Sequence, residues 1–385
     1  MISNIKLKKF LQNRIFPILS FVNQKINHNS QIILLYSNLG FRDNIRALFN
    51  YIIESGLNNK YRIVCSLNDH QKYNNLVQKN VKIISNSSGI KWYFRAGYVF
   101  YCFGKIPIIP GKNQRVGQMW HGVCFKSGDK GMLDGHQLNK QYYTDFFSTS
   151  RFLDAIWSKL FSLNPQTIKI SGQPRNDALF SKGIHYNFGL YSKLILWLPT
   201  FRKSNLMGYE DVKAAPLIPI ISIDKFEKFN QFLKERNVKI IIKLHPMQDL
   251  EQYSLTNFEN FILLSNEDFV KRNLDLYKLM AQCDAMITDY SSVFFDYLLL
   301  NRPIGFTIDD MDEYIKNRGF NFENPYMYMP GAHIKNIDGL YSFVDNLVYG
   351  IDDYISERKR VNDLFNEYQD NHSAQRVLET MGIKR

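Results

Sequence analysis

The chain has 385 residues, 45% of them hydrophobic, and a formal net charge of +12. This length and hydrophobic content favour two domains with large cores and exclude a disordered chain. The charge indicates acidic partners such as nucleic acid, anionic lipid or phosphate-rich substrates. Four scattered cysteines without a CxxC pair indicate neither a zinc site nor a disulfide framework, so reduced thiols in a cytoplasmic protein are expected.

Residues 1–30 form a basic, amphipathic segment without any acidic residue. Its apolar run is broken by Pro17 and is well under the roughly 20 residues that a membrane-spanning helix requires. No small-residue cleavage site follows an apolar core, which disfavours a signal peptide. Two interpretations remain open: a segment lying on an anionic inner membrane leaflet, or an ordinary first helix packed on the body.

Apolar runs alternate with segments of helix length along the rest of the chain, and several runs are hydrophobic throughout, as in parallel strands covered on both faces. A first series of strands is predicted at Ile32–Ser37, Tyr61–Leu67, Val81–Ser85, Tyr98–Phe103, Gly117–Trp120, Phe146–Thr149 and Ile168–Ser171. A second series is predicted at Leu194–Leu198, Val238–Leu244, Phe261–Leu264, Ala285–Thr288 and Ile304–Ile308. This alternation predicts an α/β protein with doubly wound sheets.

A turn-rich stretch at residues 181–189 separates the two series. We therefore expect an N-terminal Rossmann-like domain over residues 31–185 and a C-terminal one over residues 190–385. Two such domains usually hold a ligand in the cleft between them, outside the carboxyl ends of their strands. The loops that follow strands are therefore the candidate sites.

The first polar cluster follows the strand that ends at Trp120. His121 comes directly after this strand and before Gly122, and imidazole suits proton transfer near neutral pH. A lone histidine is more often structural, but Lys126 and Gly128 close by favour a functional role here.

Two further basic clusters also follow strands. Arg175 lies in a Gly-x-Pro-Arg turn and could bind phosphate or pair with Asp177 on the surface. Arg202 and Lys203 follow the strand that ends at Leu198 and could attract a diphosphate, or form a solvated basic turn.

A second histidine ends another strand. Lys243 and His245 stand two residues apart, so they point to the same side, and Pro246 ends the strand. His121 and His245 together offer two imidazoles that could face one another across a cleft.

A run ending in Asp289-Tyr290-Ser291-Ser292 predicts a buried strand, a tight turn and a helix that begins near Ser292. The free N–H groups and positive dipole of a helix start suit a phosphate. Asp296, about one turn further, could accept the hydroxyls of a nucleotide ribose. The alternative is an ordinary serine N-cap.

Common cofactor signatures do not occur in the sequence, which contains neither GxxxxGKS nor GxGxxG. Asp309, Asp310 and Asp312 could suggest a metal, but they fit the acidic first turn of a helix better. We therefore predict no metal and no cofactor.

Five motifs in this order resemble those of the CDP-glycerol glycerophosphotransferase family, of the teichoic acid primase and polymerase type. They are Gln118-x-x-His121-Gly122-x-x-x-Lys126-x-Gly128, Gly172-x-Pro174-Arg175-x-Asp177, Pro199-Thr200-Phe201-Arg202, Lys243-Leu244-His245-Pro246 and Thr288-Asp289-Tyr290-Ser291-Ser292-x-x-Phe295-Asp296. Weaker similarities are Ser37-x-x-Gly40-x-x-x-Asn44, Asp275-x-Tyr277, Arg302-Pro303-Ile304 and Pro330-Gly331.

The resemblance implies a GT-B-like pair of Rossmann-type domains that face a central cleft, with CDP-glycerol held mainly by the second. It implies transfer of glycerol phosphate to a hydroxyl of a lipid-linked or polysaccharide acceptor, with release of CMP, in teichoic acid or capsule synthesis. The expected location is peripheral, at the cytoplasmic face of the bacterial cell membrane.

The resemblance also implies roles for single residues. His121 and His245 belong to the active site; we expect His121 to be the general base, because it lies on the acceptor-side domain, and His245 to donate a hydrogen bond to the phosphate or leaving oxygen. Ser291 and Ser292, aided by Arg202, would hold the diphosphate. The remaining expected substrate-binding residues are Gly122, Lys126, Arg175, Asp177, Thr200, Lys243, Asp289 and Asp296.

Val123-Cys124 stands where family members usually carry Thr-Pro, which leaves the identity of the acceptor open. A CDP-ribitol-dependent enzyme, or a GT-B glycosyltransferase that uses a UDP-sugar, would share the architecture. A nucleic-acid-binding protein is disfavoured, because the basic residues recur at strand ends beside Gly and Pro and not on one face with stacking aromatics.

Overall fold

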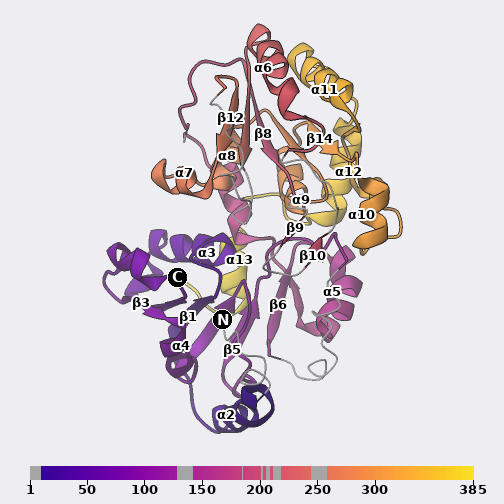
Figure 1. Ribbon diagram of the computed structural model, residues 1–385. Coiled ribbons are helices and arrows are strands. Elements are labelled where there is room, and N and C mark those ends of the chain that lie inside the picture. Colours follow the sequence, from indigo (N-terminus) through magenta and orange to yellow (C-terminus); the bar gives the residue numbers. More distant parts are fainter. Residues whose placement is uncertain are drawn as a thin grey trace. The chain divides into compact units, whose positions relative to one another are not determined.

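A computed structural model describes residues 10–127, 142–183, 185–200, 203–204, 209–210, 218–243 and 258–385. The chain forms two compact units. Unit 1 comprises Met1–His121, Lys130–Ala178 and Glu367–Arg385, and unit 2 comprises Gly122–Asp129 and Leu179–Asn366 (Figure 1). Each unit is an α/β sandwich around a parallel sheet, as the alternation of apolar runs predicts.

Unit 1 contains a seven-stranded sheet of order β3-β2-β1-β4-β5-β6-β7, and all its described strand pairs are parallel. Its strands are β1 (Asn29–Ser37), β2 (Arg62–Leu67), β3 (Val81–Ser85), β4 (Ala96–Tyr101), β5 (Arg115–Gln118), β6 (Asp145–Ser148) and β7 (Ile168–Ile170). The seven strands predicted from the sequence are confirmed, with ends shifted by up to three residues. The strand order reverses between β1 and β4, which is where doubly wound folds hold their ligands.

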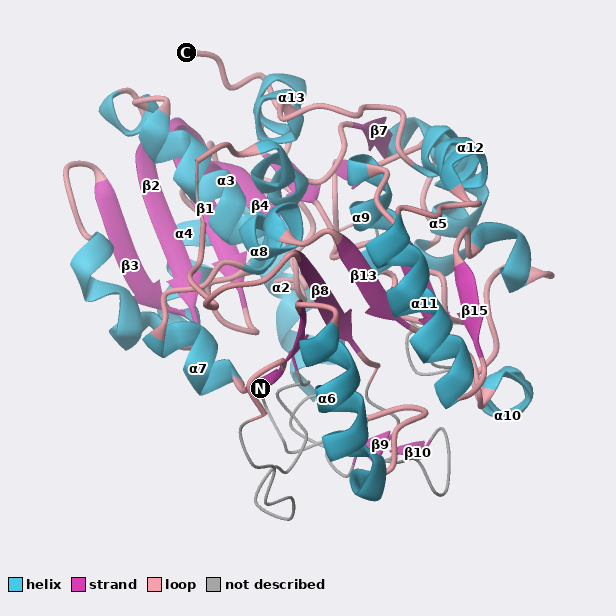
Figure 2. Cartoon of the chain, turned by 90° about the horizontal axis from the view of Figure 1, so that it is seen from above, coloured by secondary structure: helices cyan, strands magenta, loops and turns pink. Residues whose placement is uncertain are grey.

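Helices α3 (Asp43–Glu54) and α13 (Ser373–Thr380) cover one face of this sheet, and α4 (Asn86–Tyr93) packs on β1 and β2 (Figure 2). Ile45, Leu48, Phe49 and Ile52 recur at the spacing of one helix face and bury it in the same core as α13. The sequence placed residues 190–385 in a single domain, whereas Glu367–Arg385 belong to unit 1. The apolar face of α13 is buried there, which gives the physical reason.

Unit 1 also contains α2 (Phe16–Asn23), α5 (Asp154–Phe161) and several single helical turns. Among the residues that the structure describes, no helix is both long enough and apolar enough to cross a bilayer. All four cysteines are free, and Cys65, Cys102 and Cys283 are buried.

Unit 2 contains a six-stranded sheet of order β12-β11-β8-β13-β14-β15, again with parallel pairs throughout. Its strands are β8 (Lys193–Leu198), β11 (Val238–Lys243), β12 (Phe261–Leu264), β13 (Ala285–Thr288), β14 (Ile304–Thr307) and β15 (Ala332–Ile334). The first five agree with the prediction. The sequence did not reveal β15, which has three residues, nor the two-residue strands β9 (Lys203–Ser204) and β10 (Tyr209–Glu210).

The order of this second sheet also reverses, between β8 and β13. Helices α6 (Phe226–Glu235) and α11 (Ile337–Tyr349) share one core with one face of the sheet. The remaining helices are α7 (Asn266–Lys271), α8 (Leu276–Gln282), α9 (Val293–Tyr297), α10 (Met311–Asn317) and α12 (Ile355–Phe365). Because α9 follows β13 directly, its first turn lies beside the point where the strand order reverses.

Candidate active site

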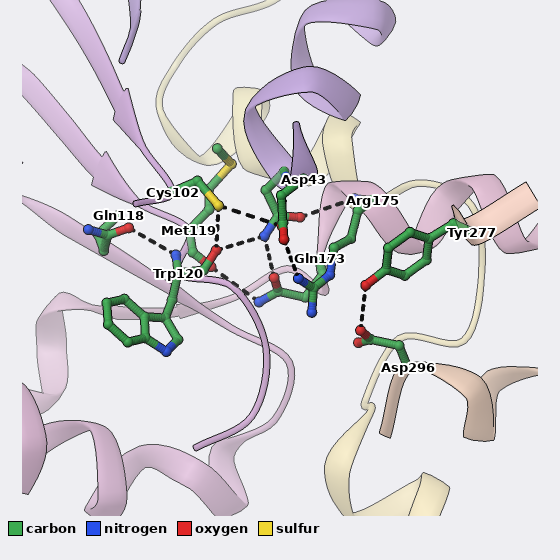
Figure 3. A network of polar contacts seen from close by, with 10 residues as sticks. Asp43, Cys102, Gln118, Met119, Trp120, Gln173, Arg175, Tyr277 and Asp296 are labelled. Atoms are coloured by element: carbon green, nitrogen blue, oxygen red, sulfur yellow. Dashed lines mark hydrogen bonds and ion pairs between the residues drawn. The ribbon is translucent and has the colours of Figure 1, made fainter. Parts of the chain in front are cut away.

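The carboxyl ends of several unit 1 strands bring a set of polar residues together (Figure 3). Asp43 and Asn44 follow β1, Cys102 follows β4, Trp120 follows β5 and Arg175 follows β7. Parallel strands end at the same edge of a sheet, so these residues meet although they are far apart in the sequence.

The His121 ring stacks between two aromatic rings at this edge. Its centroid lies 4.2 Å from the ring of Trp120 and 4.9 Å from that of Phe103, with interplanar angles of 28° and 21°. The pKa of His121 is lowered to about 4, mainly by burial; Asp43 opposes this shift, and Arg175 and Arg42 contribute to it. The imidazole is therefore neutral at physiological pH and able to accept a proton.

The backbone around His121 adopts an unusual conformation. Trp120 has a φ of +54° and Gly122 a φ of +119°. A positive φ is tolerated by glycine but costs about 1–3 kcal/mol for a bulky residue such as tryptophan. The surrounding contacts must therefore hold Trp120 in place.

Arg175 is buried and forms an ion pair with the partly exposed Asp43, at 2.7 Å between Nη1 and Oδ2. The interpretation of Arg175 as a surface partner of Asp177 is therefore wrong. Asp177 instead accepts the N–H groups of Ser373 and Ala374, both at 2.9 Å, and so holds the start of α13. Arg175 and Asp177, although two residues apart in the sequence, therefore bond to different parts of unit 1.

The segment that follows His121 belongs to unit 2. Phe125 is 1% exposed and packs on the rings of Phe294, Phe295, Phe320 and Phe322, with centroids 4.8–5.8 Å away. This aromatic cluster fixes the segment that carries Gly122 and Lys126.

Hydrogen bonds reinforce that anchor. The Asn321 side-chain amide donates to the carbonyls of Cys124 and Lys126, at 2.8 and 2.9 Å, and its N–H donates to the Phe125 carbonyl. Gly128, which belongs to the same motif, lies outside the described residues.

At the strand-order reversal of unit 2, Asp289 joins the ends of β8 and β13. This fully buried carboxylate accepts the N–H of Thr200 at 2.6 Å, the Thr200 hydroxyl and the N–H of Ser291 at 3.2 Å. The structure thus brings together three of the predicted substrate-binding residues at the position where α/β folds bind nucleotides.

Helix α9 begins at Val293, as predicted, but Ser292 makes no side-chain capping hydrogen bond and has helical dihedrals. The alternative of an ordinary Ser292 N-cap is therefore not supported. Asp296 is buried and accepts a hydrogen bond from the hydroxyl of Tyr277, at 2.8 Å (Figure 3). Tyr277 lies in α8, so this contact ties α8 to α9.

The other predicted residues are only partly described. Lys243 ends β11, with its Nζ 5.1 Å from the centre of the Phe269 ring. His245 and Arg202 lie outside the described residues.

The acidic cluster proved to be the start of a helix. Asp312 lies in the first turn of α10, and Asp310 accepts a hydrogen bond from the Tyr290 hydroxyl at 2.6 Å. Within the described ranges, no group of three His, Cys, Asp or Glu side chains could hold a metal ion.

Sequence reasoning missed the residues that support His121, namely Asp43, Asn44, Cys102 and Gln173. Asn44 stood in the weak motif that begins at Ser37, which was the available signal. Nothing local marked Asp43 or Gln173, because their partners in the other loops are more than 50 residues away.

Comparison with known proteins places these motifs in a family. The family model described as CDP-glycerol:poly(glycerophosphate) glycerophosphotransferase matches residues 18–382. The teichoic acid poly(glycerol phosphate) polymerase of Bacillus spizizenii is 27% identical, over 80% of this chain and 82% of its own. The teichoic acid glycerol-phosphate transferase of Staphylococcus aureus is 24% identical, over 97% and 98%.

Other relatives are named for a different transferred group, ribitol phosphate. The teichoic acid ribitol-phosphate polymerase TarL of S. aureus is 26% identical over 70% of this chain, which spans about half (48%) of that protein. Among solved structures, the wall teichoic acid polymerase TagF, as an H444N variant soaked with CDPG, superposes with a TM-score of 0.75 at 21% identity, over 99% of this chain and 95% of that one.

That likeness confirms a GT-B-like α/β fold, and the family match spans nearly the whole chain, including both strand-order reversals and the His121 segment. The chain belongs to the CDP-glycerol:poly(glycerophosphate) glycerophosphotransferase family, and it is a transferase of that class.

Proposed function

We propose that the protein transfers glycerol phosphate from CDP-glycerol to a hydroxyl of a lipid-linked or polysaccharide acceptor and releases CMP, in teichoic acid or capsule synthesis. One observation carries the proposal: in a chain that the family model matches from residue 18 to 382, Thr200, Asp289 and Ser291 meet at the strand-order reversal of unit 2. A nucleotide diphosphate is the ligand that this position of a doubly wound sheet suits.

In this reaction the acceptor oxygen attacks the β-phosphorus in line, the bond from that phosphorus to the CMP oxygen breaks, and CMP leaves with the electron pair. Catalysis of such a transfer depends mainly on positioning and charge stabilisation. His121 takes the proton of the attacking hydroxyl. His245 donates a hydrogen bond to the phosphate or the leaving oxygen, and Arg202 with the hydroxyls of Ser291 and Ser292 offsets the diphosphate charge.

The donor is tested with purified protein, candidate acceptors and three donors: CDP-glycerol, CDP-ribitol and UDP-sugars. We expect CMP release and glycerol phosphate incorporation with CDP-glycerol. CDP-ribitol is the second candidate, because the ribitol-phosphate polymerases match at 24–26% identity, close to the 24–28% of the glycerol-phosphate enzymes. Turnover of a UDP-sugar alone would overturn the proposal.

The pH dependence tests the state of His121. A base must be neutral to act, and the pKa of His121 is lowered to about 4, so its competence is present above that value and lost as the pH falls through it. We expect kcat/KM to stay nearly constant between about pH 7.5 and about pH 5.5. An imidazole of ordinary pKa would be only about one-tenth neutral at about pH 5.5, so a roughly tenfold fall there would contradict the assignment.

We also propose that α2 binds an anionic membrane surface. The helix packs on unit 1 through polar residues: Ser20 accepts the Ile109 N–H at 3.0 Å, and Asn23 donates to Gln114 at 2.9 Å. Its apolar side chains Ile18 and Phe21 are instead 61% and 64% exposed. This supports both open interpretations of the segment: it is packed on the body, and it presents apolar side chains beside basic residues such as Lys25.

Substituting Ile18→Ser or Phe21→Ser is expected to weaken sedimentation with phosphatidylglycerol vesicles by about tenfold or more, since burying such a side chain contributes about 1.5–3 kcal/mol. Leu190→Ser is the matched control, because Leu190 is 91% exposed but lies in unit 2. Wild-type binding by both α2 variants would rule out this surface.

A further inference from the structure

Asn44 connects three loops at the carboxyl edge of the unit 1 sheet. Its side chain is fully buried, and its Nδ2 donates to the carbonyl of Trp120 at 2.9 Å and to Oε1 of Gln173. Its Oδ1 accepts the N–H of Arg175 at 3.1 Å. The loop after β1 is thereby bonded to the loops after β5 and β7.

The orientation of this amide is determined by its backbone partners. The Trp120 carbonyl can only accept a hydrogen bond, and the Arg175 N–H can only donate one, so Nδ2 and Oδ1 cannot exchange places. The same argument applies to Gln173, whose Nε2 donates to the Met119 carbonyl at 3.2 Å and whose Oε1 therefore faces Asn44. The network has one arrangement, and every polar atom of the Asn44 amide is used.

This network holds the strained residue next to His121. The Trp120 carbonyl accepts from Asn44 and also from the thiol of Cys102, at 3.0 Å. The Trp120 N–H donates to Oε1 of Gln118 at 3.0 Å. These bonds keep Trp120 at its positive φ, which turns the chain so that the His121 ring lies against the Trp120 indole.

We propose that Asn44 is a positioning residue for His121: by donating to the Trp120 carbonyl, it holds the backbone turn that places the imidazole between Trp120 and Phe103. The inference rests on the proposed function, in which His121 is the base. It adds a residue, acting through the backbone, whose loss misplaces the base without touching substrate. A misplacement of about 1 Å can cost about 100-fold in rate.

Two substitutions test whether the hydrogen-bond donor Nδ2 of Asn44 is required, one with a neutral and one with a charged side chain. Asn44→Leu keeps a similar volume and removes the donor, and Asn44→Asp keeps the acceptor for the Arg175 N–H but replaces Nδ2 with oxygen. We expect both to lower kcat by about 10- to 100-fold, with the KM for CDP-glycerol unchanged, because donor binding is assigned to unit 2.

Asn58→Leu provides the matched control for folding. Asn58 is also buried in unit 1 and donates to a backbone carbonyl, that of Lys79, at 3.2 Å. We expect it to lower the melting temperature about as much as Asn44→Leu while leaving kcat unchanged. Loss of kcat in both variants alike would assign Asn44 a structural role only and overturn the proposal.

Two further readouts are specific to His121. In a His121→Ala background, Asn44→Leu is expected to cause no further loss, since a residue that acts through His121 has nothing left to position. In NMR titrations of labelled histidine, Asn44→Leu should raise the pKa of His121 toward its ordinary value as the ring leaves its stack, with Asp43, Arg42 and Arg175 still the charges around it.

These experiments distinguish the positioning role of Asn44 from the assignment of His121 as the base. An additive loss in the double variant, or wild-type kcat for Asn44→Leu, overturns the role of Asn44 while the base assignment stands. Full turnover by His121→Ala overturns the base assignment itself, and the NMR titration still shows whether Asn44 positions the ring.

Discussion

Replacing His121 with alanine is expected to lower the rate of CMP release with acceptor present by about 10²- to 10⁴-fold, the usual contribution of a general base. The reason is geometric and electrostatic: the ring is held by stacking at the strand-end edge of unit 1, and its lowered pKa keeps it neutral. The measurement is steady-state CMP release at saturating CDP-glycerol, with acceptor in the assay.

Binding of CDP-glycerol by His121→Ala, measured by calorimetry, should remain close to wild type, because the donor residues are assigned to unit 2. His333→Ala is the matched control: this histidine is exposed in unit 2 and contacts the Met329 carbonyl. Full CMP release by His121→Ala would refute the base assignment.

Replacing Phe125 with alanine is expected to lower the free energy of unfolding by about 3–5 kcal/mol, the cost of removing a large aromatic side chain from a packed core. Phe125 is almost fully buried among four other phenylalanine rings of unit 2, two of them in α9. The cavity would lie directly under the helix that carries the predicted diphosphate site. Urea unfolding followed by near-ultraviolet circular dichroism measures the change.

Phe125→Leu, which fills part of the space, should cost markedly less than Phe125→Ala. Phe21→Ala provides the exposed control and is expected to stay within about 0.5 kcal/mol of wild type. A loss below about 1 kcal/mol for Phe125→Ala would mean that the aromatic cluster collapses around the gap and does not anchor the segment after His121.

In unit 2, the predicted strand, turn and helix start are confirmed, because their sequence signal is local. The run that ends at Asp289 and Ser291 contains a buried strand, a turn and a helix start within a few residues, and all three occur in the structure. The parallel order of β8 and β13 then brings Thr200 to Asp289. Periodicity and turn chemistry were therefore enough to predict these elements, whereas the contact between Thr200 and Asp289 became visible only in the structure.

The acceptor-side prediction was less complete because its contacts are distant in sequence. Arg175 was considered beside Asp177, two residues away, but its carboxylate partner is Asp43, 132 residues away. Asp177 in turn bonds the start of α13, almost 200 residues further along the chain. A single sequence contains no local signal for such pairs.

The sequence by itself determined the α/β class, twelve of the strands, the motifs that resemble the family and the position of His121 at a strand end. These features depend on patterns within about ten residues, which strand and helix periods make readable. Only the tertiary structure decided that α13 completes unit 1, that the pKa of His121 is lowered to about 4, and that Asn44 bonds the Trp120 carbonyl. Each of these depends on burial and on charges or donors supplied by distant strand ends, which exist as neighbours only after the sheet has formed.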